Sequence, residues 1–200
     1  MEVFLIRHGL TAGNLQKRYV GRTDEPLCPK GIAAAQKAGS FPAVSRVIVS
    51  PMLRAKQTAA LLFPQAEQQV LDGLREMDFG VFEGRTADEM VSDAAYRTWV
   101  DGNCQDVCPG GEGMHGFSSR TLSTFDQAVQ KAIRTGESRL VIVAHGGTLM
   151  AVMDRYAMPK RAYWDWHVPT LHGWRASLDS IKWDAAPALL DYARMEAISL

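Results

Sequence analysis

Three short apolar runs along the chain are each followed by a helical pattern. The runs cover residues 2–6, 46–49 and 139–144, and a short continuous apolar run is typical of a strand buried on both faces of a sheet. This alternation predicts an α/β fold: a three-layer sandwich with a mostly parallel central sheet and helices on both faces. The helical patterns occupy residues 31–38, 52–63, 117–133 and a stretch that begins after Gly147.

The alternation is interrupted between residues 78 and 116. This segment is rich in glycine, has only short helical patterns near residues 87–100, and contains a Pro-Gly-Gly turn at residues 109–111. We expect it to be an insertion that packs over one end of the sheet as a lid, so that residues 1–200 form a single domain. The last two strands are predicted in residues 174–178 and 189–195.

The composition is that of an ordinary globular protein. Hydrophobic residues make up 46% of the chain and charged residues 22%, which excludes a disordered chain, a collagen-like chain and a coiled coil. The 22 basic residues balance 22 acidic ones, so no net field attracts nucleic acid or an anionic membrane. The first apolar run is too short for a signal peptide or a membrane span, and three cysteines are too few for a disulfide framework. We therefore expect a soluble cytoplasmic protein without nucleic-acid or membrane partners; a homodimer is compatible with the sequence, which leaves the oligomeric state open.

Two of the apolar runs end in a His-Gly pair, His8-Gly9 and His145-Gly146. The carboxyl ends of strands are where open α/β sheets bind ligands. Glycine lets the backbone approach a ligand closely, and the N-terminus of a following helix offers unpaired N–H groups to an anion. Arg7 stands beside His8 at the end of a buried strand, where an unpaired charge would be costly. The sequence therefore predicts an anion site at this edge of the sheet.

Two further segments carry groups suited to phosphate chemistry. The segment SPMLRAKQTA, residues 50–59, contains Arg54, and LREMDFG, residues 74–80, contains Glu76. Together with LIRHG at residues 5–9 and VAHGG at residues 143–147, these motifs resemble, in the correct order, the signatures of the histidine phosphatase superfamily, which includes cofactor-dependent phosphoglycerate mutases. The resemblance spans residues 3–147 and implies a phosphoglycerate mutase-like fold with a lid.

The resemblance also implies a phosphohistidine mechanism. His8, as a neutral imidazole, would attack phosphorus and split one difficult displacement into two easier ones. Arg7 and Arg54 would bind the phosphoryl oxygens through their guanidinium forks. A protonated His145 would be a further phosphate ligand.

Among the nearby carboxylates, the resemblance favours Glu76 as the general acid over Asp78 and Glu83. Glu76 would protonate the leaving alkoxide and then activate water, while Glu83 would hold its loop. No metal and no cofactor is implied, and the partner would be a small phosphorylated metabolite. The resemblance also implies substrate contacts at Asn14, Val20, Gly21 and Gly146.

Five other residues that could carry chemistry match no motif. His115, His167 and His172 are predicted to be structural, with the alternative that His115 reaches the pocket from the lid. Cys104 and Cys108 lack the second pair that a structural zinc site requires, so we expect free thiols.

The charge of the lid separates two reactions known in this superfamily. Between residues 86 and 114 the acidic side chains outnumber the single base, Arg97. A mutase must bind a second phosphate, which an acidic lid would repel, so we expect hydrolysis of a monophosphate. The acidic residues are Asp88, Glu89, Asp93, Asp101, Asp106 and Glu112.

The Trp-rich segment at residues 163–167, with Trp174, resembles the corresponding region of α-ribazole phosphatases. These side chains, together with Phe82, Tyr96 and Trp99, could line a pocket for the leaving group or pack in the core. The substrate implied is α-ribazole 5′-phosphate, a precursor of the cobalamin lower ligand. A cofactor-dependent phosphoglycerate mutase, a broad-specificity sugar or metabolite phosphatase, and a phospho-ligand-binding protein without activity remain open.

Overall fold

The computed structural model of the chain describes residues 1–38 and 44–196. Within them, a six-stranded sheet has the order β3-β2-β4-β1-β5-β6. The pairs β1–β4, β2–β4 and β2–β3 are parallel, whereas β5 is antiparallel to both β1 and β6. The strands are β1 (Glu2–Arg7), β2 (Arg46–Val49), β3 (Glu67–Val70), β4 (Arg139–Ala144), β5 (His172–Ser177) and β6 (Leu190–Glu196).

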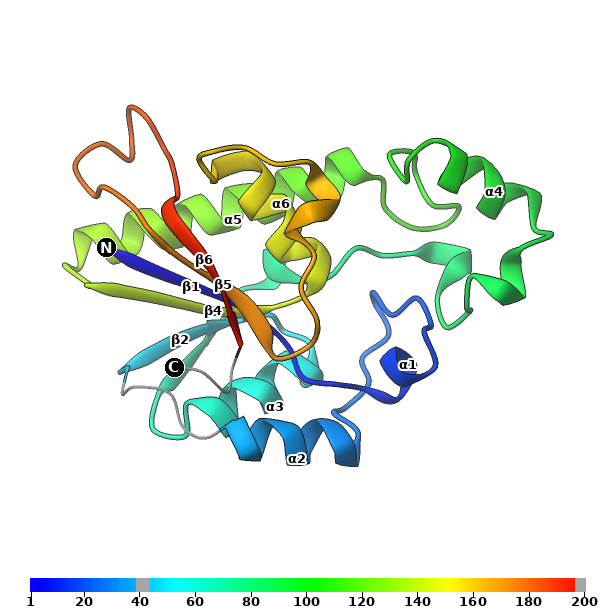
Figure 1. Cartoon of the computed structure of the whole chain (residues 1–200), viewed down its shortest axis with the longest axis horizontal. Helices are drawn as coiled ribbons and strands as arrows, with labels where there is room; N and C mark the ends of the chain where they lie inside the picture. The colour runs from blue at the N-terminus through cyan, green and yellow to red at the C-terminus, as the bar shows by residue number, and fades with distance from the viewer. Residues whose placement is uncertain (39–43, 197–200) are drawn as a thin grey trace.

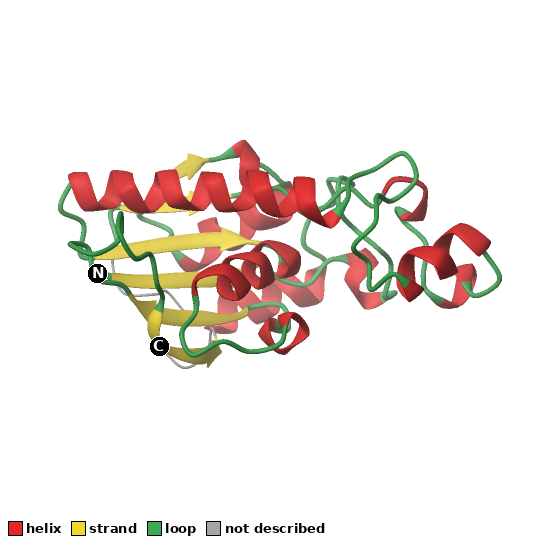
Figure 2. Cartoon of the chain, turned by 90° about the horizontal axis from the view of Figure 1, so that it is seen from above, coloured by secondary structure: helices red, strands yellow, loops and turns green. Residues whose placement is uncertain are grey.

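Helices cover both faces of this sheet, as Figures 1 and 2 show. The pair α2 and α3 lies on one face, and the pair α5 and α6 lies on the other. The α-helices are α1 (Ala12–Leu15), α2 (Pro29–Ala38), α3 (Leu53–Leu62), α4 (Ala94–Asp101), α5 (Met114–Arg134) and α6 (Gly146–Tyr156). Four short 3-10 turns are η1 (Asp72–Leu74), η2 (Gly80–Phe82), η3 (Asp88–Met90) and η4 (Tyr163–Trp166). The predicted three-layer α/β sandwich is confirmed.

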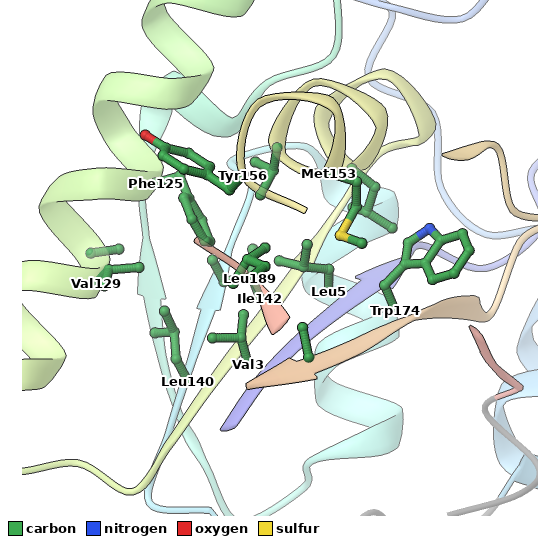
Figure 3. Close-up of a cluster of buried hydrophobic side chains, with 14 of the residues drawn as sticks. Val3, Leu5, Phe125, Val129, Leu140, Ile142, Met153, Tyr156, Trp174 and Leu189 are labelled. Atoms are coloured by element: carbon green, nitrogen blue, oxygen red, sulfur yellow. The ribbon is translucent and has the colours of Figure 1, made fainter. Parts of the chain in front are cut away.

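The two faces of the sheet bury alternate residues of each strand. On β1, Val3 and Leu5 pack beneath α5 and α6, whereas Ile6 packs toward α2 and α3. On β4, Leu140 and Ile142 likewise face the opposite side from their neighbours. Figure 3 shows the first of these clusters, in which aromatic side chains from the helices close over the strands. Because β1, β2 and β4 are covered on both faces, they are mostly apolar, which explains the uniform runs in the sequence.

The strand β3 is not predicted by the sequence pattern. Its residues, Glu67–Val70, are mostly polar and partly exposed, because it is the edge strand and pairs only with β2. Main-chain pairing, rather than a buried apolar face, holds it in the sheet. The two predicted C-terminal strands are confirmed as β5 and β6.

The insertion between β3 and α5 lies beyond the carboxyl ends of the parallel strands, at the right of Figures 1 and 2. It has its own apolar cluster, centred on Phe82, Met90, Tyr96 and Trp99. Tyr19, from the loop after α1, joins this cluster and its hydroxyl lies 2.9 Å from that of Tyr96. The insertion is therefore packed against the same edge of the sheet at which the His-Gly pairs emerge.

Of the helices in residues 1–38 and 44–196, none has the combination of length and apolar character needed to cross a bilayer.

Candidate active site

Adjacent parallel strands bring the two His-Gly pairs together. In the register of β1 and β4, Arg7 is opposite Ala144, so His8 and His145 follow at the same level. Their ring centroids are 5.1 Å apart, and both side chains are buried. The site therefore lies at the carboxyl edge of the sheet.

His8 is held with one ring nitrogen directed at the backbone. Its Nδ1 lies 2.7 Å from the carbonyl oxygen of Gly9, which can only accept, so Nδ1 carries the proton and Nε2 carries the lone pair. The Gly9 N–H donates to Oγ1 of Thr58 at 2.8 Å, and that hydroxyl donates to the Arg54 carbonyl at 2.7 Å. Helix α3 thus fixes the loop that presents His8.

Burial keeps both histidines neutral. It lowers the pKa of His8 well below its usual value, and the charges of Arg54 and Arg7 lower it further. Burial, followed by the same arginines and His8, also lowers the pKa of His145. This lowering applies to the site without a bound anion, and protonation of His145 against a phosphoryl group stays a prediction. Nε2 of His145 lies 2.7 Å from the hydroxyl oxygen of Ser50.

Arg54 is fully buried and bonded to the loop after α1. Its Nη1 donates to the Thr23 carbonyl at 2.7 Å and its Nη2 to the Gly21 carbonyl at 2.9 Å, with Val20 at 3.4 Å. Glu83 holds the same loop from the other side, since its carboxylate accepts the Gly21 N–H at 3.0 Å. The prediction that Glu83 holds this loop is confirmed.

Arg7 is bonded to the segment that follows η4. Its Nη1 donates to the Val168 carbonyl at 2.7 Å and lies 3.1 Å from Nε2 of His167. The guanidinium can only donate, so His167 accepts with a neutral ring. Burial, followed by the charge of Arg7, lowers the pKa of His167, which favours that neutral form. His167 was predicted to be structural, and no local sequence signal connects it to Arg7.

Three buried nitrogens of this site have no acceptor in the protein: Nε of Arg7, Nε of Arg54 and Nδ1 of His145. In the described residues, only Thr121 and Trp166 have other side-chain atoms of this kind. An unpaired buried donor is costly, so buried polar groups nearly always find a partner. Two guanidinium groups and an imidazole with spare donors form a site for a compact oxyanion.

Glu76 faces this site from the irregular segment after η1. Its Oε2 accepts the Gly147 N–H at the start of α6, and its Oε1 accepts its neighbour Met77 N–H, both at 3.0 Å. A Cβ atom at Gly147 would lie 2.4 Å from Oε1, so only glycine leaves room for the carboxylate there. Asp78 points elsewhere and pairs with Arg22 at 3.4 Å.

The remaining predicted contacts are bonded within the protein. The Asn14 side chain accepts the Thr11 N–H in a capping box at the start of α1. Val20 and Gly21 present their carbonyls to Arg54. Gly146 lies against Arg7, and a Cβ atom there would be 3.4 Å from the Arg7 guanidinium carbon.

A pocket of about 240 Å³ opens beside Arg7, Glu76 and Gly146. Its walls are mainly aromatic rings and thioethers, with His167 at the polar end. These walls comprise Tyr19, Met77, Phe79, Trp99, Met114, Phe117, Met150, Tyr163 and Trp164. Trp164 thus lines the pocket, whereas Trp166 is fully buried behind it and His115 is exposed and away from it.

The lid acids, which were predicted to repel a second phosphate, do not form the walls of the pocket. No acidic lid residue is among the described residues that line the pocket. Three of these acids pair with arginines: Glu89 with Arg18, Asp93 with Arg85 and Glu112 with Arg120. The lid instead contributes apolar side chains to the pocket walls, among them Phe79 and Trp99.

Comparisons with known proteins identify a family and several similar structures. A model of the histidine phosphatase superfamily (branch 1) matches residues 3–186. A probable phosphoglycerate mutase GpmB from Salmonella choleraesuis (strain SC-B67) is 31% identical over 153 residues, which are 73% of this chain and 70% of that protein. The crystal structure of a putative alpha-ribazole-5′-P phosphatase from Escherichia coli K-12 has a TM-score of 0.82 at 27% identity, covering 100% of this chain and 98% of that one. The alpha-ribazole phosphatase from Shigella flexneri has a TM-score of 0.79 at 25% identity, covering 100% and 99%.

Proposed function

The chain belongs to the histidine phosphatase superfamily and is a phosphatase, and from that premise we propose that it hydrolyses phosphomonoesters through a phosphohistidine on His8. The observation that carries this proposal is the set of unpaired buried nitrogens on Arg7, Arg54 and His145 beside a neutral His8. A phosphoryl group would supply acceptors to these donors and would balance the charge of the two arginines.

In the first step, the lone pair on Nε2 of His8 forms a bond to phosphorus, and the bond between phosphorus and the ester oxygen breaks. The Nδ1–H bond to Gly9 keeps the lone pair on Nε2. Arg7 and Arg54 stabilise the charge on the phosphoryl oxygens, and Glu76 gives its proton to the leaving oxygen. In the second step, Glu76 takes a proton from water, the water oxygen attacks phosphorus, and the bond to Nε2 breaks to release phosphate.

For the leaving group, we propose a neutral, aromatic, nucleoside-like alcohol; the best candidate is α-ribazole, released from the substrate α-ribazole 5′-phosphate. The aromatic walls of the pocket support this choice, because rings such as Trp99 and Trp164 stack on planar groups. The likeness to two α-ribazole phosphatases supports it as well. If this is correct, the reaction serves assembly of the cobalamin lower ligand.

The second candidate is a phosphoglycerate mutase, which the GpmB relatives favour. A mutase substrate carries a second acidic group that needs cations. Among the described residues that line the pocket, Arg7 is the only arginine and lysine does not occur. The pocket walls therefore favour hydrolysis of a monophosphate over mutase activity.

The test is kcat/KM across a panel of α-ribazole 5′-phosphate, 3-phosphoglycerate, a fructose bisphosphate and p-nitrophenyl phosphate. We expect α-ribazole 5′-phosphate to exceed the acidic substrates by more than about tenfold. Rapid quenching should trap an acid-labile, base-stable phosphoenzyme that His8→Ala lacks. Conversion of 3-phosphoglycerate to 2-phosphoglycerate would instead assign a mutase, and a preference for sugar phosphates would assign a broad-specificity phosphatase. Full hydrolysis by folded His8→Ala would overturn the mechanism.

A further inference from the structure

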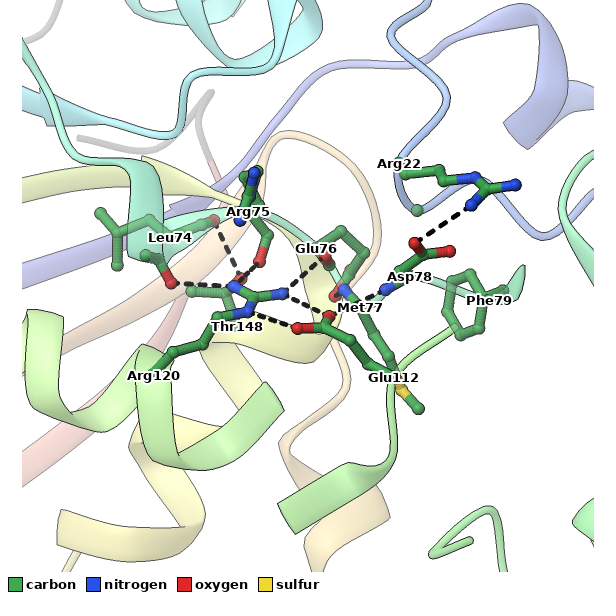
Figure 4. Close-up of polar contacts among 12 residues, drawn as sticks. Arg22, Leu74, Arg75, Glu76, Met77, Asp78, Phe79, Glu112, Arg120 and Thr148 are labelled. Carbon is green, nitrogen blue, oxygen red and sulfur yellow. Dashed lines mark hydrogen bonds and ion pairs between the residues drawn. The ribbon is translucent and has the colours of Figure 1, made fainter. Parts of the chain in front are cut away.

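Arg120, on helix α5, faces the irregular segment that carries Glu76, and Figure 4 shows its bonds. All five N–H groups of its guanidinium are used. Nη1 donates to the carbonyls of Gly73 and Arg75 at 2.9 and 2.8 Å, and Nη2 donates to the carbonyl of Glu76 at 2.9 Å. Nε and Nη2 also donate to the Glu112 carboxylate at 2.8 and 2.7 Å.

Glu112 extends this hydrogen-bond network to Asp78, on the other side of Glu76 along the chain. Its Oε2 also accepts the Asp78 N–H at 3.0 Å, and its own N–H donates to the Asp78 carbonyl at 2.8 Å. Burial raises the pKa of Glu112, but the hydrogen bonds from Arg120 and Asp78 outweigh it, and the net pKa is lowered. The carboxylate thus stays charged near neutral pH. Together Arg120 and Glu112 hold the main chain on both sides of Glu76.

This arrangement separates Arg120 from the phosphate-binding arginines. Arg7 and Arg54 each have a buried Nε without an acceptor, whereas Arg120 has no spare donor. Arg120 is also not among the described residues that line the pocket. Its place is therefore behind the acid, not against the substrate.

The segment after η1 needs such support, because Arg75–Phe79 belongs to no helix or strand. Main-chain ladders do not fix the position of Glu76, and its carboxylate must reach Gly147 on another element. A displacement of about 1 Å from a productive geometry can cost as much as a hundredfold in rate.

We propose that Arg120 and Glu112 are positioning residues that hold Glu76 where it protonates the leaving oxygen. This rests on the proposed function, in which Glu76 is the general acid. Neither residue contacts substrate. Their substitution should therefore lower kcat/KM most for substrates whose leaving group needs a proton. Good leaving groups depart as anions and do not need the acid.

The experiment measures kcat/KM for a series of substituted phenyl phosphates, from phenyl phosphate to 2,4-dinitrophenyl phosphate. This quantity reports formation of the phosphoenzyme and is independent of its later hydrolysis. The first test variant is Arg120→Lys, which keeps the positive charge but loses the planar guanidinium fork. The second is Glu112→Gln, which keeps the shape of the side chain but leaves either Arg120 or the Asp78 N–H facing an NH₂ group. Glu76→Gln is the reference.

Arg46→Lys is the matched control. Arg46 pairs with Glu137 at the amino end of β2, and the side-chain exposures of 16% and 29% match the 20% and 29% of Arg120 and Glu112. Thermal melting checks that all four variants are folded. If Arg120→Lys fails to fold, Glu112→Gln still tests the proposal.

We expect both test variants to lower kcat/KM for phenyl phosphate by about ten- to a hundredfold and for 2,4-dinitrophenyl phosphate by less than about threefold. Glu76→Gln should show the same dependence more steeply, and Arg46→Lys should show none. The positioning role alone would be wrong if Arg120→Lys and Glu112→Gln lowered kcat/KM equally for every phenyl phosphate, while the loss in Glu76→Gln depended steeply on the leaving group. If Glu76→Gln lowered kcat/KM equally for every substrate, the general-acid role of Glu76 and the positioning proposal would both be wrong.

Discussion

The hydroxyl oxygen of Ser50 lies 2.7 Å from Nε2 of His145, and both side chains are fully buried. Ser50 follows β2 and His145 follows β4, which are parallel neighbours in the sheet. The contact sets the orientation of the His145 ring, whose other nitrogen, Nδ1, is left without an acceptor in the protein. In the proposed mechanism, Ser50 therefore determines which nitrogen of His145 faces the phosphoryl group.

Replacing Ser50 by alanine should release the His145 ring. Because a neutral hydrogen bond contributes about 1 kcal/mol net, we expect kcat/KM to fall by roughly fivefold, and the melting temperature should fall as well because Nε2 of the buried ring loses its partner. Kinetics on p-nitrophenyl phosphate would measure this. Unchanged kcat/KM in Ser50→Ala would show that the contact does not orient the ring.

The two buried histidines make stability depend on pH. The pKa values of His8 and His145 are lowered well below 6.5 in the folded protein, mainly by burial and then by Arg54, whereas both titrate near 6.5 when unfolded. Below pH 6.5 the unfolded chain therefore binds more protons, and the free energy of unfolding falls as pH falls. The slope is up to about 1.4 kcal/mol per pH unit for each histidine.

Urea unfolding between pH 5 and 7.5 tests this dependence. His145→Gln should remove up to about half of the histidine slope below pH 6.5 and leave the slope above it unchanged. His115→Gln, at an exposed position, is the control. A slope that is the same in the parent protein and in His145→Gln would contradict the neutral buried histidine.

Gly147→Ala should displace the Glu76 carboxylate, because the new Cβ atom would lie 2.4 Å from Oε1. We expect kcat/KM for phenyl phosphate to fall by at least about tenfold, since the acid loses its position. Gly116→Ala is the matched control on α5, where a Cβ atom meets nothing within 4 Å. Equal activity of the two variants would show that Glu76 tolerates the displacement.

Trp164→Ala should weaken binding of aromatic leaving groups. Trp164 lines the pocket and is 52% exposed, so its removal leaves the core intact. Ring stacking contributes about 0.5–1.5 kcal/mol, so KM for a nucleoside-like phosphate should rise by roughly two- to thirteenfold. An alkyl phosphate, measured in parallel, should show no change. The same KM increase for both substrates would argue against stacking on this ring.

Activity should persist after exhaustive treatment with EDTA. The groups at the site are two histidines, two arginines and one carboxylate, and guanidinium groups supply the positive charge that a divalent cation would otherwise supply. Hydrolysis of p-nitrophenyl phosphate before and after chelation measures this. A loss that zinc or magnesium restores would contradict the proposed mechanism.

The pattern of residues along the chain was enough to predict the layers of the fold and the edge of the sheet at which the candidate site lies. Buried strands read as apolar runs because helices cover both their faces, and a residue directly after such a strand must lie at the edge of the sheet. Two His-Gly pairs after two such runs therefore lie at that edge, and the register of β1 and β4 places them side by side. Arg54 and Glu76 could be chosen because their motifs resemble those of a known family.

The contacts that orient these site residues come from segments far away in the sequence, and they became visible once the elements were packed together. His167 is separated from Arg7 by 160 positions, and Arg120 is separated from Glu76 by 44, so no local spacing connects them. The absence of the lid acids from the pocket walls likewise depends on packing, since a net charge counted along a segment does not tell which side chains face a pocket. Local patterns report burial and secondary structure, whereas contacts between distant segments depend on how the elements pack against one another.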